Sequence, residues 1–203
     1  LGPCMDPEEV RQDWADRSGR FSPTYYAHLG PNGVSETLAD VLGHYLTDDA
    51  AILEVGCGSG RHLDHLRREG FENLSGVDIN DDAFDVMADH FPELAESGDF
   101  YTGALEDRLP EFDDGAFDAI YTVETLQHVH PDDVWVFDEF SRITTDLLVT
   151  AENEGNSPDR GRGEFDVSYV DDEFPLYHRN WEAVFSDRGF AQLLREPTSR
   201  DTI

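Results

Sequence analysis

Residues 52–62 read I-L-E-V-G-C-G-S-G-R-H, and this stretch decides the fold. A short apolar run, broken by Glu54, leads into glycines at positions 56, 58 and 60, and L-D-H-L-R-R-E follows at 63–69. This pattern predicts a buried strand, a tight turn and a helix. Glycines at such a turn let the backbone bend sharply and let a ligand approach the main chain. The stretch therefore predicts a nucleotide-binding edge.

The glycine spacing distinguishes two kinds of nucleotide site. A dinucleotide fingerprint, G-x-G-x-x-G, would need glycine at position 61, where the chain has Arg61. Asp78 follows a second predicted strand about 20 residues after the loop, where a carboxylate can accept hydrogen bonds from ribose hydroxyls. Asp78 suits either kind of site, whereas Arg61 argues against an NAD-dependent enzyme.

The motif Glu54-x-Gly56-x-Gly58-x-Gly60 resembles the first motif of class I S-adenosylmethionine-dependent methyltransferases, closest to their small-molecule branch. Residues 103–110, 116–121 and 123–129 resemble later segments of that family in the expected order. The resemblance implies an α/β fold with a Rossmann-like, seven-stranded, mostly parallel sheet, helices on both faces and a late antiparallel hairpin. It also implies S-adenosylmethionine as cofactor, with contacts from Glu54, Gly56, Cys57, Gly58, Ser59, Gly60, Asp78, Ile79, Asn80, Leu105, Glu106 and Val123.

Alternating patterns along the chain predict the order of the elements. Strands are expected at 50–55, 74–78, 99–102, 117–122 and 145–151, with a late strand at 190–194. Helices are expected at 6–17, 34–46, 60–69, 81–90, 132–141 and 181–188. Residues 21–28 are expected to be irregular, and 153–163 to form a loop. Such alternation favours a parallel sheet covered on both faces.

The length and composition of the chain limit the number of domains and the cellular compartments that are compatible with it. A chain of 203 residues is expected to form one globular unit. We divide it into an N-terminal helical and aromatic lid segment (1–34) and a cofactor-binding domain (35–203). No apolar stretch approaches the roughly 20 residues of a membrane span, and no leader pattern opens the chain, so a cytoplasmic protein without a membrane partner is expected. Cys57 lies in the glycine loop and Cys4 near the N-terminus, so no disulfide is expected.

The charge is extreme and evenly spread. The chain has 45 acidic residues against 14 arginines and no lysine, for a formal net charge of −31. An acidic interaction tail would form a local block of like charge, and the sequence contains no such block. Chain-wide acidity without lysine resembles cytosolic proteins of salt-accumulating halophiles. The absence of a basic stripe argues against nucleic acid as a partner, although a halophile's nucleic-acid enzymes would also be acidic.

His128 and His130, in Q-H-V-H-P after the fourth predicted strand, are the candidate catalytic residues. Both would lie at the edge where open α/β sheets bind ligands, and a general base is needed if the acceptor must lose a proton. The structural alternatives are that His128 packs against the sheet or caps the next helix, and that His130 is exposed before Pro131. Histidines two residues apart with no nearby cysteine lack the usual zinc ligand set, so no metal is expected.

Two aromatic clusters are candidates for the acceptor site. Tyr25, Tyr26 and His28 could cover the cofactor or substrate, or could anchor an N-terminal helix on the core. Tyr177 and Arg179 could line the acceptor pocket, or could cap the helix that is expected to begin near Asn180.

Three functions are compatible with these patterns. The leading hypothesis is methyl transfer from S-adenosylmethionine to a small-molecule acceptor by in-line displacement. A non-catalytic S-adenosylmethionine-binding module and a methyltransferase acting on RNA or protein are the alternatives. An NAD-dependent enzyme is disfavoured by Arg61. The sequence indicates neither the methylated atom nor the oligomeric state.

Overall fold

The computed structural model describes residues 6–155, 163–170 and 174–197. Its centre is a five-stranded sheet in the order β3-β2-β1-β4-β5, and every neighbouring pair is parallel. The strands are β1 (Ala51–Val55), β2 (Asn73–Asp78), β3 (Asp99–Thr102), β4 (Phe117–Val123) and β5 (Thr144–Ala151). The order reverses beside β1, so the carboxyl ends of β1, β2 and β4 meet at a switch point of the kind where open α/β sheets bind ligands.

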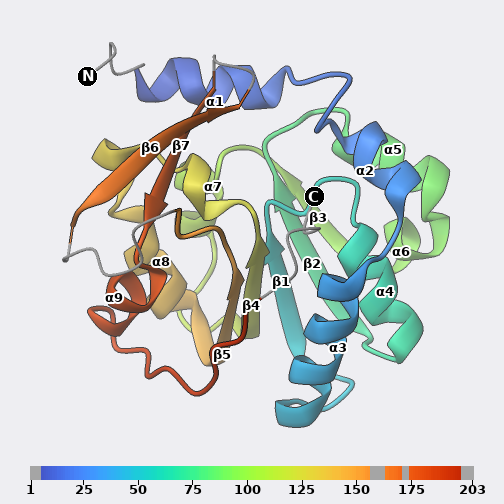
Figure 1. The fold of residues 1–203 in the computed structure, drawn as a ribbon. Coiled ribbons are helices and arrows are strands. Elements are labelled where there is room, and N and C mark those ends of the chain that lie inside the picture. The colour runs from blue at the N-terminus through green and yellow to red at the C-terminus, as the bar shows by residue number, and fades with distance from the viewer. Residues whose placement is uncertain (1–5, 156–162, 171–173, 198–203) are drawn as a thin grey trace.

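Helices cover both faces of this sheet (Figure 1). One hydrophobic cluster includes Ile52 and the helices α3 (Gly33–Tyr45), α4 (Arg61–Glu69), α5 (Ala83–His90) and α6 (Pro92–Ser97). The other cluster includes Leu53 and Val55 and the helices α8 (Val136–Ile143) and α9 (Trp181–Ser186). Successive strand residues point to opposite faces, which is why adjacent residues of β1 contribute to different layers.

Short helical segments follow strands β3 and β4. They are α7 (Leu105–Arg108) and the 3₁₀ turns η1 (Leu109–Glu111), η2 (Leu126–His128) and η3 (Pro131–Asp133). At the N-terminus, α1 (Pro7–Ala15) begins at a capping box formed by Asp6 and Glu9. The helix α2 (Pro23–Leu29) begins at Ser22, whose hydroxyl accepts from the Tyr25 N–H. Pro7 and Pro23 each stand in the first turn, where a missing N–H costs nothing.

The five parallel strands and the helices predicted near 34–46, 60–69, 81–90 and 181–188 are confirmed. The seven-stranded sheet is not confirmed. The strands β6 (Phe165–Val170) and β7 (Phe174–Arg179) pair antiparallel with each other as a separate two-stranded sheet. Their hairpin lies beside α1 instead of extending the edge at β5 (Figure 1).

Several other predictions are wrong. Residues 21–28 were expected to be irregular, but Ser22 and Pro23 start α2 there. The helix expected at 132–141 is divided into η3 and α8. Residues 190–194 form no strand, and both leucines of this apolar run, Leu193 and Leu194, are exposed. Residues 156–162 of the expected loop, and Cys4, lie outside the described residues.

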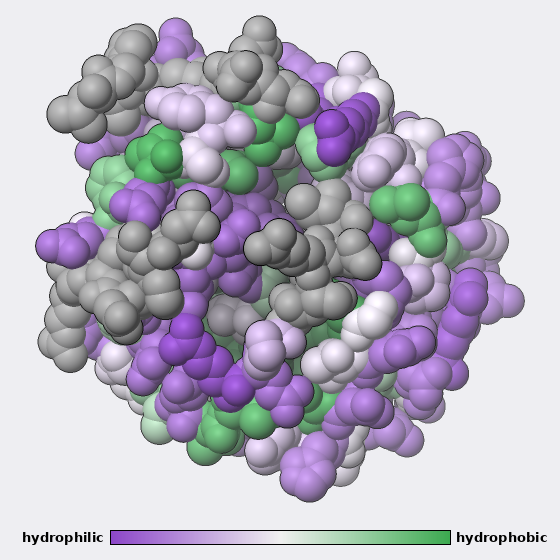
Figure 2. Space-filling view, viewed as in Figure 1, coloured by the Kyte–Doolittle hydropathy of each residue, from purple (hydrophilic) through white to green (hydrophobic). Residues whose placement is uncertain are grey.

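The surface seen in Figure 2 is mainly hydrophilic, in keeping with the large number of acidic residues in the sequence. Within the described residues, no helix is long and apolar enough to cross a membrane.

Candidate functional site

The glycine loop wraps over the end of β2. The N–H groups of Gly56 and Cys57 both donate to the Val77 carbonyl, at 2.8 and 3.0 Å. The Gly58 N–H donates to Asp78 Oδ2 at 2.6 Å. These bonds fix the loop to the second strand before α4 begins at Arg61. The strand, turn and helix predicted from residues 52–62 therefore form one rigid edge.

Two of the glycines are needed for different reasons. Gly56 has φ +76°, and a Cβ there would overlap the Thr125 side chain, so only glycine fits between the loop and η2. Gly58 has φ +52°, but a Cβ there would meet no atom within 4 Å. Gly58 also lines the cavity described below, so the space next to it is open for a ligand. The left-handed conformation favours glycine at both positions.

Glu54 and Asp78 place a buried and a partly buried carboxyl group at this edge. Asp78 Oδ1 accepts from the Asn80 N–H at 2.9 Å, and burial raises the pKa of its carboxyl despite that bond and the one from Gly58. Glu54 is 1% exposed and accepts from the Tyr121 hydroxyl at 2.9 Å. Burial raises the Glu54 pKa well above its ordinary value, while the Tyr121 bond and the nearby Arg61 charge oppose the rise.

One cavity joins the loop to the N-terminal segment. Most of the predicted cofactor contacts line this cavity: Glu54, Gly56, Cys57, Gly58, Ser59, Asp78, Ile79, Asn80, Leu105, Glu106 and Val123. Gly60 does not line it. A Cβ at Gly60 would lie 2.7 Å from Leu94 and Met87, so this glycine permits close packing of α4 on α5 and α6.

Glu106 connects the cavity wall to α1. Its carboxylate lies 4.0 Å from the Arg11 guanidinium, which also binds Asp133 at 2.8 Å. Burial raises the Glu106 pKa, and the Arg11 charge opposes that rise. The Glu106 carboxylate thus faces a charge from the N-terminal helix at one end of the cavity, next to Leu105 of α7.

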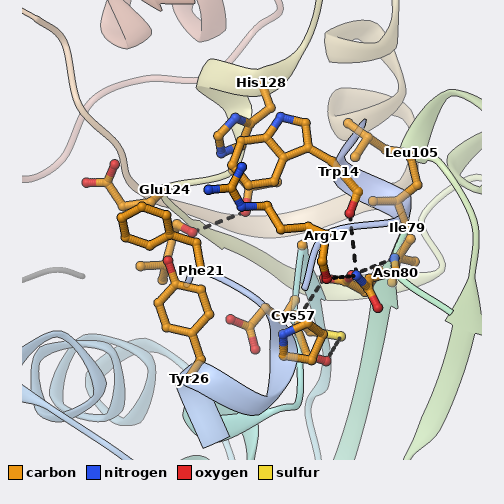
Figure 3. A pocket seen from close by; sticks show the side chains of 18 of the residues that line it. Trp14, Arg17, Phe21, Tyr26, Cys57, Ile79, Asn80, Leu105, Glu124 and His128 are labelled. Atoms are coloured by element: carbon orange, nitrogen blue, oxygen red, sulfur yellow. Dashed lines mark hydrogen bonds between the residues drawn. The ribbon is translucent and has the colours of Figure 1, made fainter. Parts of the chain in front are cut away.

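His128 lines the cavity opposite the glycine loop. Its ring lies against the Trp14 indole, with ring centroids 4.0 Å apart (Figure 3). Burial lowers the His128 pKa to about 3, so the imidazole is neutral at physiological pH. Its Nδ1 atom is buried and has no hydrogen-bond partner among the described residues.

His130, Tyr177 and Arg179 do not line the cavity. His130 Nδ1 accepts from the Asp132 N–H at 3.1 Å, and its ring packs edge-on against Tyr177 at 5.4 Å. Arg179 donates to the Val129 carbonyl at 2.8 Å and is 4% exposed. Leu176 of the same strand does line the cavity. Because side chains alternate along a strand, Tyr177 and Arg179 point away from the ligand space when Leu176 points into it.

Of the three candidate residues in α2, only one lines the cavity. Tyr26 lines the cavity, and its ring lies 4.8 Å from the Arg61 guanidinium carbon. Tyr25 packs edge-on against Tyr26 at 5.3 Å without lining the cavity. His28 is exposed and contacts His90 at 5.0 Å, so it lies on the outer surface between α2 and α5.

Sequence reasoning missed part of the cavity wall. Trp14, Arg17 and Phe21 line the cavity from the N-terminal segment, together with Val10 and Arg11. Figure 3 shows the Arg17 side chain running alongside Trp14, with its guanidinium carbon 5.0 Å from the centre of that ring. Asn80 Nδ2 donates to the Arg17 carbonyl at 3.0 Å, which ties this segment to the residue beside Asp78. The spacing of Val10 and Trp14, four residues apart on one helix face, was the available signal.

The charged side chains of the cavity are not arranged as a metal centre. Among the residues that the structure describes, no cluster of three His, Cys, Asp or Glu side chains could hold a metal ion.

Comparison with known proteins finds a family model and curated relatives that are similar to part of this chain. A family model described as "Methyltransferase domain" matches residues 52–146, from β1 to the first residues of β5. Ubiquinone biosynthesis O-methyltransferase from Maricaulis maris is 27% identical over 137 residues, covering 63% of this chain and 53% of the relative. The chain spans about half the length of the curated relatives it matches. The region that the family model matches contains the glycine loop and Asp78.

Two solved structures share the fold. PH0226 protein from Pyrococcus horikoshii OT3 has a TM-score of 0.62 at 19% identity, covering 97% of this chain and 95% of that one. Geranyl diphosphate C-methyltransferase from Streptomyces coelicolor A3(2), solved with Mg²⁺, geranyl diphosphate and S-adenosyl-L-homocysteine, has a TM-score of 0.59 at 15% identity. It covers 90% of this chain and 78% of that one. At these identities the likeness concerns the fold alone.

Proposed function

We propose that this chain transfers a methyl group from S-adenosylmethionine to a small-molecule acceptor. The observation that carries the proposal is a single cavity with two different ends. Glu54, the glycine loop and Asp78 form one end, and Trp14 and His128 form the other. The first end has acceptors for an ammonium group and for ribose hydroxyls, and the second could hold the group to be methylated.

The residues present fit this cofactor. Gly58 leaves open space beside the loop, and Ser59 Oγ is buried on the cavity wall with no hydrogen-bond partner among the described residues. Asp78 would accept from the two ribose hydroxyls, and Ile79, Leu105 and Val123 would flank the base. When bound, S-adenosylmethionine supplies a methyl group on a sulfonium that is already activated for displacement. The protein mainly has to position the acceptor and exclude water.

His128 acts as a positioning group instead of the general base suggested by its place in the sequence. A pKa of about 3 makes the ring a weak proton acceptor at neutral pH. The neutral ring can still accept a hydrogen bond from an acceptor hydroxyl and orient its oxygen towards the methyl group. Trp14 and Phe21 give this end of the cavity an aromatic wall, which suits a planar acceptor.

The finer assignments belong to the same proposal. The relatives named for ubiquinone biosynthesis favour a hydroxyl group on a small molecule as the methyl acceptor. Residues 1–34 act as a lid segment, and residues 35–203 bind the cofactor. The boundary between these parts falls within the first turn of α3. The net charge of −31 supports function in concentrated salt, and therefore in the cytoplasm of a salt-accumulating cell.

A product assay tests the proposal. The chain is incubated in molar KCl with S-adenosylmethionine and a catechol probe, 3,4-dihydroxybenzoate, and with bulk tRNA and a denatured protein mixture in parallel. We expect S-adenosylhomocysteine and a methylated catechol, with turnover lowered about tenfold in His128→Ala and unchanged in His90→Ala, an exposed histidine outside the cavity. Methylation of tRNA or protein alone would favour those acceptors, and cofactor binding without any methylated product would favour the non-catalytic module.

A further inference from the structure

Arg61 occupies an unusual position for a guanidinium. It is the first residue of α4, directly after the glycine loop, and it is 6% exposed. Its side chain lines the cavity and lies over the Tyr26 ring at 4.8 Å. Burying a charged side chain costs free energy unless charged or polar groups compensate for the lost water. The burial of the Arg61 guanidinium therefore has to be compensated by groups of opposite charge, in the protein or in a ligand.

Glu54 supplies the opposite charge at the same end of the cavity. Burial lowers the Arg61 pKa and raises the Glu54 pKa, and each group opposes the shift of the other through its charge. The cavity wall thus carries a buried cation and a buried acid within electrostatic reach of each other. The positive end of the α4 dipole lies on the same side as Arg61.

A ligand group with both charges matches this arrangement. An α-amino acid end carries an ammonium and a carboxylate on one carbon. The planar guanidinium fork is suited to a carboxylate, and a glutamate accepts from an ammonium. We propose that Arg61 binds the carboxylate of the methionine end of the cofactor, next to the ammonium that Glu54 accepts from in the proposed function. This inference rests on the proposed function. It also assigns Tyr26, a candidate for the acceptor site in the sequence, to the cofactor site, because the Tyr26 ring packs against the Arg61 guanidinium.

The alternative is that Arg61 only neutralises Glu54 and packs against Tyr26. The two roles differ in which ligands they affect. A binding role affects only ligands that carry the carboxylate, whereas a packing role affects every ligand of the cavity equally.

The experiment removes the charge from the protein and the carboxylate from the ligand separately. Isothermal calorimetry in molar KCl measures two ligands, S-adenosylhomocysteine and its decarboxylated analogue, which keeps the ammonium. The variants are Arg61→Gln and Arg61→Lys, with Arg68→Gln as the matched control. Arg68 is on the same helix, its side chain is 57% exposed, and it pairs with Asp64 outside the cavity.

We expect the unmodified chain to bind S-adenosylhomocysteine about 10- to 100-fold more tightly than the decarboxylated analogue. Arg61→Gln should reduce this preference to less than about threefold, Arg61→Lys should retain part of it, and Arg68→Gln should retain all of it. Equal weakening of both ligands by Arg61→Gln would overturn the inference in favour of packing. If Arg61→Gln does not fold, equal affinity of the unmodified chain for the two ligands would overturn the inference by itself. Failure of both ligands to bind the unmodified chain would instead contradict the proposed function.

Discussion

At the residue scale, Gly56 and Gly58 have the same backbone requirement and different surroundings. Gly56→Ala forces a methyl group into the Thr125 side chain, and Gly58→Ala places one in open space. The left-handed conformation costs about 1–2 kcal/mol for alanine at either position, and overpacking adds about 1–3 kcal/mol. We expect Gly56→Ala to lower the free energy of unfolding more than Gly58→Ala, as measured by urea titration. Equal losses would show that the contact with Thr125 relaxes without cost.

His62 predicts a dependence of stability on pH. Its ring is 4% exposed, lies 2.8 Å from Ser35 Oγ, and burial lowers its pKa to about 3. In the unfolded chain a histidine titrates near 6.5, so the unfolded state binds more protons between these two values. The free energy of unfolding contributed by His62 therefore falls as the pH falls below about 6.5, by up to about 1.4 kcal/mol per pH unit.

His62→Asn should remove this contribution. Other groups, including Asp78, titrate with the opposite sign, so the test is the difference between the variant and the unmodified chain at each pH. We expect the variant to lose less stability between pH 7 and pH 4 in denaturant titrations. His44→Asn, which replaces an exposed histidine of α3, is the matched control. Parallel pH profiles for His62→Asn and the unmodified chain would contradict the buried neutral imidazole.

At the element scale, the sequence predicts those strands, loops and helices whose signals lie next to one another in the chain. Residues 52–62 specify β1, the loop and α4 because the apolar run, the glycines and the helix start are adjacent in the chain. The N-terminal wall of the cavity was not predicted, because Trp14 and Arg17 reach the site only through contacts with residues more than 60 positions away, such as Asn80. Neither hairpin strand was predicted individually, although residues 165–169 (F-D-V-S-Y) alternate apolar and polar side chains as a strand does. The apolar positions of β6, Phe165, Val167 and Tyr169, are exposed and do not pack into the core.

The N-terminal segment predicts a measurable coupling to Asn80. Asn80→Asp replaces a donor to the Arg17 carbonyl with a negative charge, so it should release the contact. We expect amide hydrogen exchange to increase in α1 and in residues 16–22 while β1 and α4 stay protected. Asn73→Asp, an exposed position at the start of β2, should leave the exchange pattern unchanged. Unchanged exchange of α1 in Asn80→Asp would show that its apolar contacts hold the segment without this bond.

At the scale of the whole molecule, the net charge predicts how stability depends on salt. At 0.01 M salt the Debye length is about 30 Å, so acids scattered over the surface repel one another; at 1 M it is about 3 Å. Excluded salt also strengthens hydrophobic burial. Against a net stability of about 5–15 kcal/mol, the sum of many small repulsions can unfold a domain with a net charge of −31.

We therefore expect the melting temperature to rise steeply from millimolar to molar KCl, and to continue rising after screening is complete. Circular dichroism melts across that range measure it. A flat profile would show that the acidity has a role other than stability in salt.

The central claim is that the cavity binds S-adenosylmethionine and not a dinucleotide. Calorimetry in molar KCl with S-adenosylmethionine and NAD side by side tests it most directly. We predict that S-adenosylmethionine binds at one site per chain and NAD does not. Asp78→Ala should weaken binding by about 1–3 kcal/mol, and Asp81→Ala, an exposed neighbour, should leave it unchanged. Binding of NAD in place of S-adenosylmethionine, or equal affinity for S-adenosylmethionine in a folded Asp78→Ala variant, would contradict the account.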